Sequence, residues 1–460
     1  MKRKTVSLCI IARDEEAYIG RAIKSTLALV DEIIVVDTGS QDNTRIIAEG
    51  YGARVVDFPW RDDFAAARNA GLEAATSDWI LVLDCDEHLQ SIRPVEFQRL
   101  LADPGVAGYR VTVTGPPERR PSVFPHIRLF RNEPDIRYRY AVYDQVAPSV
   151  AAHARDTGLV VSTSPLCVVH DPGGADARSR KRDRNLRLLR QAVQEHTGEP
   201  YFEYQLGSET LLRLDAGVLP VAGLTASLDH LASAWKKVSA LPPEMRRLVP
   251  YGQVLATDLA AAQLALGRPA DAAVTVTVAS ECWGGSPYLD LQGVRAALAL
   301  AGRTAPGPAR QELLDGAARR LEVLALAGTG MDGGRALDLA LCCCRGDLAR
   351  ACGQVAEAAE AYEHALVLDQ EHATAWLGLA ECARLAGDRK RALRLYLRAV
   401  TASEWCVEAW RRGCSLMDEL GFHDNAASWR TKVAEHFPES PADPRDGQAA
   451  PDPGVAVSSP

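Results

Sequence analysis

The second half of the chain repeats itself every 34 residues, and this spacing narrows its fold more than any other feature. Small residues and one aromatic recur in register, so that Gly353, Ala358, Tyr362 and Ala365 return as Gly387, Ala392, Tyr396 and Ala399. In a unit of this length two antiparallel helices approach closely at the small residues, and the aromatic ring fills the gap between units. Because one such pair cannot bury its apolar face alone, the pattern predicts a stacked array of helices.

The period is that of tetratricopeptide repeats, and it extends beyond the two clearest copies. Gly421 and Ala426 continue it, and weaker copies open at Gly267 and Tyr204. From residue 438 the chain is rich in Pro, Asp, Ser and Gly and has no periodicity, which is typical of a disordered segment. The sequence therefore predicts an all-helical repeat domain at 201–437 and a disordered tail at 438–460.

The first part of the chain follows a different pattern, in which short β-branched runs alternate with amphipathic helical stretches. This alternation predicts βαβ units and a largely parallel sheet. Strands are expected at 6–11, 32–36, 54–58 and 79–83, and helices at 15–29, after Asp42, and at 64–75. Further extended segments near 108–113, 126–131, 136–143 and 159–169 make the sheet mixed, with a Pro-rich loop at 115–125.

A break at 171–174 ends the predicted α/β domain, residues 1–175, and a basic helix at 176–200 links it to the repeats. The formal net charge of −8 argues against nucleic acid as a partner. No apolar run approaches the roughly 20 residues that span a bilayer, and the apolar run after Lys4 is too short for an export signal. Eleven scattered cysteines without a CxxC pair indicate reduced thiols, so a cytoplasmic protein is expected.

Carboxylates follow each of the first four predicted strands. They are Asp14 and Glu15, then Asp37, then Asp57, and finally Asp84 with Asp86. A single Asp after a strand is more often a helix cap or a turn former. Ligands of open α/β sheets, however, bind beyond the carboxyl ends of the strands. The conjunction therefore predicts a site that hydrogen-bonds a nucleobase or ribose, or that holds Mg²⁺ or Mn²⁺ through oxygen ligands.

The triplet Asp84-Cys85-Asp86 stands out at the fourth strand end. In an extended segment, residues two apart share a side, so both carboxylates would face the site and Cys85 would point into the core. One carboxylate would then reach a ribose hydroxyl while the other holds a metal. Such a DxD triplet is common by chance, and its place after a buried strand is what makes it informative.

These residues carry a resemblance to a known family. The stretches VSLCIIARDEE, VDEIIVVDTGSQDNT and VVDFPWRDDFAAARNAGLEAATSDWILVLDCDE, within residues 6–87, are similar to glycosyltransferase family 2, which has the GT-A fold. With the repeats, the chain most resembles a bacterial subgroup that joins this domain to tetratricopeptide repeats and includes peptide S-glycosyltransferases of bacteriocin pathways. The resemblance implies a GT-A domain, a nucleotide diphosphate sugar as donor, and Mg²⁺ or Mn²⁺.

The resemblance also implies roles for individual residues. The nucleotide-sugar-binding set would be Arg13, Asp14, Glu15, Asp37, Arg68 and Asp84, with Asp37 at the nucleobase and Asp84 at the ribose. Asp86 would coordinate the metal. For Arg68, support of the acidic site, contact with a phosphate and a purely structural ion pair all remain open.

Three later features stay open in the same way. The subgroup has a His-Glu-Gln element after an RLFRN segment, where this chain has Tyr143-Asp144-Gln145, and Asp144 is the candidate base that deprotonates the acceptor. His170 is either a second metal ligand or a structural histidine at a strand end. The basic run from Arg178 to Arg187 is either a solvated helix face or a lid that clamps a diphosphate.

The expected function is inverting transfer of a sugar to an acceptor that is a peptide, a protein or a small natural product. The alternative is a catalytically degenerate, nucleotide-sugar-binding scaffold that acts through its repeats. A nucleotidyltransferase is a weaker third interpretation, because no Gly-rich phosphate loop follows the first strand. The repeats would bind a peptide in their groove or mediate formation of a homo-oligomer.

Overall fold

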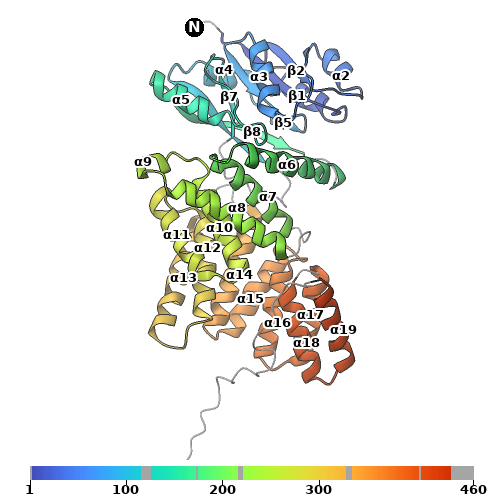
Figure 1. Cartoon of the computed structure of the whole chain (residues 1–460), viewed down its shortest axis with the longest axis vertical. Helices are drawn as coiled ribbons and strands as arrows, with labels where there is room; N and C mark the ends of the chain where they lie inside the picture. Colours follow the sequence, from blue (N-terminus) through green and yellow to red (C-terminus); the bar gives the residue numbers. More distant parts are fainter. Residues whose placement is uncertain are drawn as a thin grey trace, which may run out of the picture.

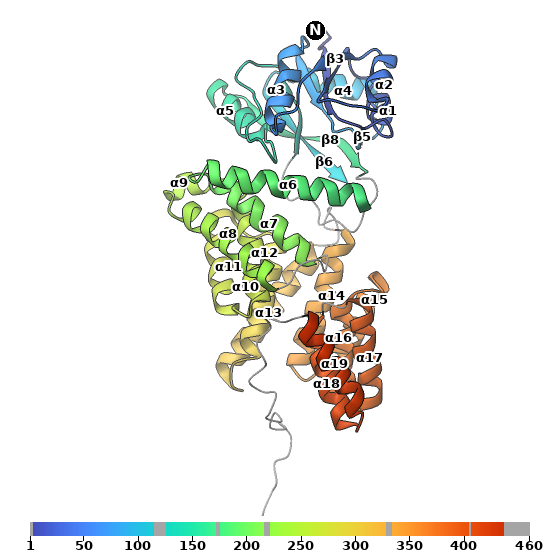
Figure 2. The ribbon, with the colours of Figure 1, turned by 45° about the vertical axis from the view of Figure 1, so that its right-hand side comes forward.

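The computed structural model describes residues 3–114, 126–171, 175–215, 221–327, 334–403 and 406–436. The molecule is elongated, with an α/β domain at one end and a helical array at the other (Figure 1). The long helix α6 (Ala175–Glu195) lies across the junction of the two parts, as the turned view in Figure 2 shows. The architecture confirms the fold class expected from the sequence.

A sheet with the strand order β3-β2-β1-β4-β7-β6-β8-β5 forms the core of the α/β domain. Its strands are β1 (Val6–Ala12), β2 (Glu32–Asp37), β3 (Arg54–Asp57), β4 (Trp79–Val82), β5 (Glu87–Leu89), β6 (Val106–Thr114), β7 (His126–Arg131) and β8 (Val160–His170). The first four strands are parallel to one another, and antiparallel pairing begins between β4 and β7. The sheet is therefore mixed beyond its fourth strand, as the sequence predicted.

Helices cover both faces of this sheet, which explains why its central strands are apolar along their whole length. The helices are α1 (Ile19–Lys24), α2 (Thr44–Gly50), α3 (Phe64–Ala74), α4 (Pro94–Leu101) and α5 (Ala147–Thr157). Ile19 and Phe97 of α1 and α4 pack into one apolar cluster, while Leu72 and Val150 of α3 and α5 pack into another. The Asp42 carboxylate accepts the backbone N–H of Thr44 at the start of α2.

Two sequence predictions in this domain are wrong in detail. The helix expected at 15–29 is confined to α1, and the hydroxyls of Ser25 and Thr26 bond to carbonyls three residues back, which competes with helix continuation. The strand expected at 136–143 is replaced by an irregular segment with one isolated bridge, between Arg139 and Gln145. Positive φ angles of 74° at Tyr140 and 54° at Tyr143 bend the chain there and preclude an extended strand.

The helical array follows from α7 onward. Its helices are α7 (Pro200–Asp215), α8 (Val221–Ser239), α9 (Pro243–Arg246), α10 (Gly252–Ala265), α11 (Pro269–Trp283), α12 (Pro287–Ala301), α13 (Pro308–Ala327), α14 (Gly334–Ala351), α15 (Val355–Leu368), α16 (Ala373–Leu385), α17 (Arg389–Ala402), α18 (Val407–Glu419) and α19 (His423–His436). The 34-residue spacing also appears in the backbone, since Gly353, Gly387 and Gly421 follow α14, α16 and α18 with φ of 79°, 80° and 83°. Only glycine adopts this left-handed turn without strain.

The recurring tyrosines are the packing centres of these repeats. The rings of Tyr362 and Tyr396 are fully buried. Around Tyr362, a Cβ added at Gly346 or at Gly378 would come within 2.7 Å or 2.4 Å of the ring. The glycines therefore make room for the aromatic ring between helices, which is the role that the sequence pattern predicted.

The junction between the two parts is an aromatic and apolar contact. Leu186 and Leu189 of α6 share a core cluster with the aromatic residues of α7. Tyr201 of α7 stacks on Tyr140 of the α/β domain with ring centroids 4.4 Å apart. α6 begins at Ala175 and α7 at Pro200, and the division into domains at these points stays a prediction.

Two features of the described ranges bear on the remaining expectations. None of their helices combines the length and apolar character needed to cross a bilayer. All eleven cysteines are free thiols. The Pro-rich loop at 115–125 and the tail at 438–460 lie outside the described residues.

Candidate active site

The carboxyl ends of β2, β1 and β4 lie side by side, because β1 pairs with β2 on one edge and β4 on the other. Ala12 is in register with Asp37, and the thiol of Cys85 donates to the carbonyl of Ile11 at 3.4 Å. Asp37 and the Asp84–Asp86 segment thus flank the end of one strand, within about 10 Å of each other. The chain brings together carboxylates that are about 50 residues apart in sequence.

Arg68 of α3 is the centre of a buried ion network. Its guanidinium donates to Asp84 through Nη2 at 2.6 Å and to Asp144 through Nε at 2.5 Å. The Arg68 side chain is only 9% exposed, and the ring of Tyr138 lies 5.3 Å from its guanidinium carbon. Of the three roles left open by the sequence, this geometry favours support of the acidic site.

A second arginine completes the network on the opposite side of Asp84. Arg128 of β7 donates through Nη2 to Asp84 at 3.2 Å and to the buried Glu87 at 2.6 Å. Burial alone would raise the pKa of Asp84, but the charges of Arg68 and Arg128 outweigh it and hold that pKa far below its ordinary value. Asp84 is therefore ionised across the physiological range.

Asp86 faces a different set of partners. Its Oδ2 accepts a hydrogen bond from Lys181 Nζ of α6 at 2.5 Å and lies 3.4 Å from His170 Nε2. Burial raises the pKa of Asp86, while the hydrogen bond from His170 and the charge of Lys181 bring it below its usual value. A partly exposed lysine ammonium thus occupies one side of a carboxylate that is itself almost fully buried.

The expectation of an extended Asp84-Cys85-Asp86 segment is wrong. The backbone N–H of Glu87 donates to the carbonyl of Asp84 at 3.0 Å, so the segment forms a turn. Asp84 consequently points toward the two arginines and Asp86 toward Lys181 and His170. Cys85 is buried in the core, as predicted.

The loop after β1 is held by the loop after β2. Asp14, at φ 54°, accepts the backbone N–H of Gln41 at 2.7 Å, and the N–H of Glu15 donates to the Thr44 hydroxyl at 2.7 Å. Burial raises the pKa of Glu15, which also feels the charges of Lys181 and Asp86. Glu15 therefore belongs with Asp84, Asp86 and Asp144 to a central cluster of carboxylates. Asp14, by contrast, fixes the loop, and Arg13 is exposed.

Two of the other strand-end carboxylates differ sharply in environment. Asp37 is buried, and its Oδ1 accepts from the backbone N–H and the hydroxyl of Ser40 at 3.1 and 2.6 Å. Asp57 is exposed and pairs with Arg45 at 2.5 Å. Asp57 thus lies outside the central cluster, although it also follows a strand of the same sheet.

The repeats position the segment that carries Asp144. The hydroxyl of Tyr143 donates to Glu209 of α7, and the hydroxyl of Tyr201 donates to the Tyr143 carbonyl at 2.8 Å. The side chain of Asp144 is 13% exposed, and within the described residues only its Oδ2 has a hydrogen-bond partner. One carboxylate oxygen is therefore left for another ligand.

Helix α6 turns three of its basic side chains toward the α/β domain. Lys181 pairs with Asp86, the guanidinium of Arg184 lies 4.9 Å from the Phe64 ring centre, and Arg187 binds Asp62 through two 3.0 Å hydrogen bonds. These three basic side chains of α6 therefore contact the α/β domain and do not form a purely solvated helix face. Figure 2 shows α6 running along the α/β domain.

Reasoning from the sequence did not identify Arg128, Glu87 and Lys181 as members of this site. Arg128 belongs to the RLFRN segment and Glu87 follows the DxD triplet, but the sequence does not show that the two side chains meet beside Asp84. Lys181 belongs to a run of six basic residues, and no pattern in that run distinguishes it. His126 lies near the same network, and burial and the charge of Arg128 lower its pKa to about 4.

The residues around Asp86 suit a divalent cation shared with a ligand. No group of three or more His, Cys, Asp or Glu side chains suited to a metal occurs in the described ranges. Mg²⁺ and Mn²⁺ in nucleotide sites need only one or two protein ligands, since phosphate and water complete the shell. Asp86 Oδ2 and His170 Nε2 lie 3.4 Å apart, which suits two ligands with bonds of about 2.1 Å to one ion.

Comparison with known proteins agrees with this architecture. Residues 7–147 match the family described as glycosyl transferase family 2. That range contains β1 to β7, the Asp84–Asp86 turn and Asp144. The N-terminal domain is therefore a glycosyltransferase family 2 domain, and the chain joins it to tetratricopeptide-like repeats.

Several curated relatives share part of the chain. A TPR repeat-containing protein of Synechococcus elongatus is 36% identical over 209 residues, covering 44% of this chain and 51% of the relative. An uncharacterized glycosyltransferase of Rickettsia bellii is 40% identical over 99 residues, covering 22% and 33%. LpsC of Rhizobium meliloti, a lipopolysaccharide core biosynthesis glycosyltransferase, is 34% identical over 112 residues, covering 23% and 41%. The chain thus spans about half the length of the first relative and less of the other two.

Proposed function

We propose that the protein is an inverting glycosyltransferase that moves a sugar from a nucleotide diphosphate sugar to a peptide, a protein or a small natural product. The observation that carries this proposal is the convergence of Asp84 and Asp144 on Arg68, beside Asp86, at the strand ends of a family 2 domain. In open α/β sheets this edge binds ligands. Partly buried carboxylates paired with a buried arginine at such an edge are arranged for chemistry rather than for solubility.

The donor would lie along the strand ends. Asp37, fixed by Ser40, would hydrogen-bond the nucleobase, and Asp84 would accept from a ribose hydroxyl. Arg13, Asp14 and Glu15 would line the nucleotide pocket from the adjoining loop. The support for this arrangement is the order β2-β1-β4, which sets these residues along one edge.

Asp86 and His170 would hold Mg²⁺ or Mn²⁺. When bound, such a cation offsets the negative charge that develops on the departing diphosphate. Lys181 would have to leave Asp86 as the cation arrives, and its ammonium group would then be free to pair with a phosphate oxygen. Lys181 and Arg184 are the members of the basic run that favour the lid interpretation over the solvated one.

Asp144 would act as the base that takes the acceptor proton. Arg68 holds one of its oxygens, which orients the carboxylate and leaves the other oxygen for the nucleophile. As a base, this carboxylate must lie within hydrogen-bond reach of the acceptor. Placement of the acceptor would depend on the repeats, because α7 holds the Tyr143 backbone.

Incubation of the full chain with a panel of nucleotide diphosphate sugars, with and without Mn²⁺, tests this proposal. Release of nucleotide diphosphate should depend on Mn²⁺ and should fall strongly in Asp86→Asn and Asp144→Asn. Asp57→Asn, at the neighbouring strand end but outside the cluster, should retain activity. NMR of the transferred sugar should show an inverted anomeric configuration, and retention would refute the inverting mechanism.

One observation favours the alternative of a degenerate, nucleotide-sugar-binding scaffold. Arg68 neutralises both Asp84 and Asp144, a pairing that stabilises the fold whether or not catalysis occurs. Calorimetric binding of a donor, without hydrolysis or transfer to any acceptor, would support the scaffold. The absence of binding by any donor at millimolar concentration would refute both interpretations.

A further inference from the structure

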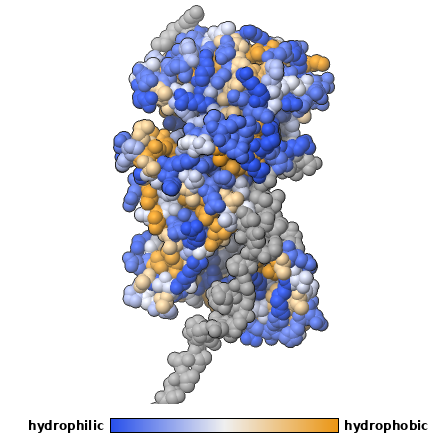
Figure 3. Space-filling model, in the orientation of Figure 1, coloured by the Kyte–Doolittle hydropathy of each residue, from blue (hydrophilic) through white to orange (hydrophobic). Residues whose placement is uncertain are grey.

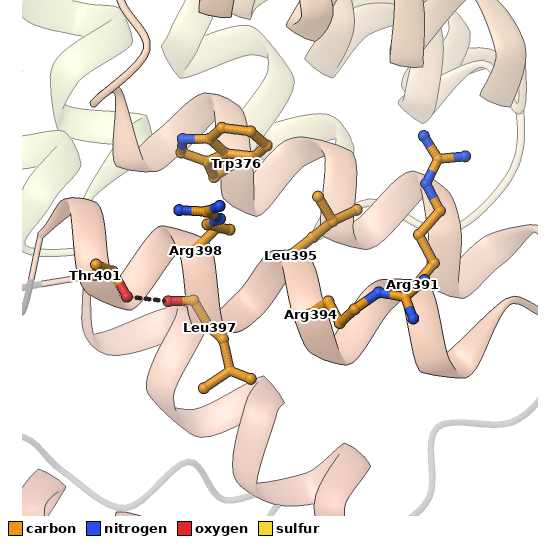
Figure 4. A pocket seen from close by; sticks show the side chains of 7 residues that line it. All are labelled: Trp376, Arg391, Arg394, Leu395, Leu397, Arg398 and Thr401. Atoms are coloured by element: carbon orange, nitrogen blue, oxygen red, sulfur yellow. Dashed lines mark hydrogen bonds between the residues drawn. The ribbon is translucent and has the colours of Figure 1, made fainter.

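A basic groove lies on the repeat array, far along the chain from the site described above. It has a volume of about 600 Å³ and is formed by α16 and α17. Its lining combines two apolar side chains and three guanidinium groups around one indole, namely Trp376, Arg391, Arg394, Leu395, Leu397 and Arg398. Figure 4 shows Leu395 between Trp376 with Arg398 on one side and Arg391 with Arg394 on the other.

The charge of α17 is opposite to that of the chain as a whole. The helix carries five cations, Arg389, Lys390, Arg391, Arg394 and Arg398, and no acidic residue, whereas the chain has a formal net charge of −8. Residues 391, 394 and 398 recur every three or four positions and so share one helix face. The basic character is therefore local and one-sided.

The repeat architecture does not require these arginines. One period earlier, the positions of Arg391 and Arg394 are occupied by Glu357 and Glu360 in α15. One period later, the position of Arg394 is Ser428. The buried positions, by contrast, keep alanine at Ala358, Ala392 and Ala426, and α15 and α17 share the tyrosine. At the positions of Arg391 and Arg394 the equivalent helices carry opposite or no charge, so packing does not require these two cations.

The charges of the groove are largely unmatched within the protein. Arg391 lies 3.8 Å from Glu363, at the limit of an ion pair. Across the described ranges, Arg394 and Arg398 have no ion pair, and both side chains are exposed. Leu397 is 42% exposed, while the indole N–H of Trp376 is already satisfied by the Gln370 carbonyl at 2.8 Å. Guanidinium groups and apolar side chains are thus free for a ligand.

We propose that this groove binds an acidic, extended peptide segment of a partner protein. Residues 391 to 398 span about 10 Å of helix, which matches three residues of extended chain. Arginine forms two-pronged hydrogen bonds with carboxylates, and Leu397 and Trp376 offer apolar surface to aliphatic side chains of the peptide. Charge complementarity favours a peptide of this composition, and the negative charge of the whole chain disfavours a long polyanion.

A direct binding measurement tests the proposal with the full chain. The probe is a short fluorescein-labelled peptide in which Glu alternates with Leu, followed by fluorescence anisotropy. A matched peptide with Gln in place of Glu, a single-stranded oligonucleotide and inorganic phosphate are the comparison ligands. The Glu peptide should bind most tightly, and its affinity should fall as salt is raised.

Charge reversal of individual groove residues provides the matched variants. Arg394→Glu and Arg398→Glu should each weaken binding of the Glu peptide by about tenfold or more, the change that about 1.4 kcal/mol produces. Arg319→Glu, an exposed position on α13, makes the same charge change elsewhere and should leave the affinity unaltered. Circular dichroism should show the same helix content in all three variants, since the substituted side chains are exposed.

Three results would overturn the proposal. The first is equal affinity for the Glu and Gln peptides, which would leave the arginines without a role. The second is tighter binding of the oligonucleotide or of phosphate, which would assign the groove to another anion. The third is an equal loss of affinity in Arg319→Glu and Arg394→Glu, which would trace the effect to net charge alone.

Discussion

Replacing Arg68 by methionine should destabilise the α/β domain severely. Methionine keeps most of the apolar stem of the side chain but removes the charge. Asp84 and Asp144 would then lose hydrogen bonds of 2.6 and 2.5 Å, and Asp144 would keep no cation among its described partners. Loss of one partner from a buried ion pair costs about 3–5 kcal/mol, because an uncompensated buried charge remains.

The size of this effect can be converted into a melting temperature. For a domain of 150–250 residues, 1 kcal/mol shifts Tm by roughly 2–4 °C, so Arg68→Met should lower Tm by roughly 6–20 °C. Arg187→Met is the matched control, because Arg187 and its partner Asp62 are 56% and 37% exposed. An exposed pair of this kind contributes at most about 1 kcal/mol.

The effect should depend on pH in a defined direction. In the native protein the pKa of Asp84 lies below its unfolded value, so its stabilisation is present above about pH 4 and is lost only as the pH falls further. Without Arg68, the larger of the two charges that lower the pKa of Asp84 is gone, so burial raises that pKa, and protonation at lower pH removes part of the unfavourable charge. The deficit of Arg68→Met relative to the native protein should therefore shrink as the pH falls from 7 to about 5.

Differential scanning calorimetry across this pH range measures both quantities. Adding Asp144→Asn to the Arg68→Met variant should recover part of the lost stability, since it removes the carboxylate that no longer has a cation among its described partners. A loss in Arg68→Met no larger than that in Arg187→Met, or a deficit independent of pH, would refute the view that Arg68 neutralises a buried carboxylate pair.

Three further outcomes follow from the same structure. Asp86→Asn should change stability by less than about 1 kcal/mol, because its lysine partner is partly exposed, yet should weaken Mn²⁺-dependent donor binding at least tenfold by calorimetry. Gly378→Ala should lower the free energy of unfolding, measured with urea, by about 1–3 kcal/mol, since the new Cβ would come within 2.4 Å of the Tyr362 ring. Gly316→Ala, where nothing lies within 4 Å of the new Cβ, should be neutral or slightly stabilising. The low pKa of His126, about 4 against an ordinary 6.5, should reduce native stability by up to about 3 kcal/mol as the pH falls from 6.5 to 4, and His126→Gln should lack that portion of the pH dependence.

The exposed surface offers a separate test of self-association. Exposed apolar side chains occur on α9, α11 and α13, at Met245, Val274, Val323 and Leu326. Figure 3 shows apolar residues over the side of the array on which these helices lie. If this surface mediates the homo-oligomer expected from the sequence, size-exclusion chromatography with light scattering should report a dimer. The variant Val323→Asp, which places a charge on the surface, should then be a monomer.

Local periodicity determined much of the architecture. Short apolar, β-branched runs located β1, β2, β3 and β4 to within a residue at each end, and in β1 and β4 the run is continuous because the strand is buried. The 34-residue spacing located the helix pairs, because glycine, alanine and tyrosine must recur wherever two helices touch at the same angle. The parallel pattern also indicated the edge at which Asp37 and Asp84 lie, whereas the strand order β3-β2-β1-β4 came only from the structure.

Only the tertiary structure decided how the charged side chains pair. Arg68 meets Asp144 across 76 residues of sequence, and Lys181 meets Asp86 across 95, distances over which no local pattern carries information. The turn at residues 84–87 was missed for the same reason, since Arg128 and the partners from other elements draw the two carboxylates apart. Packing within a strand or a helix pair depends on residues that are close in sequence, so a local pattern predicts it. The charge network depends on which distant side chains the completed fold brings together.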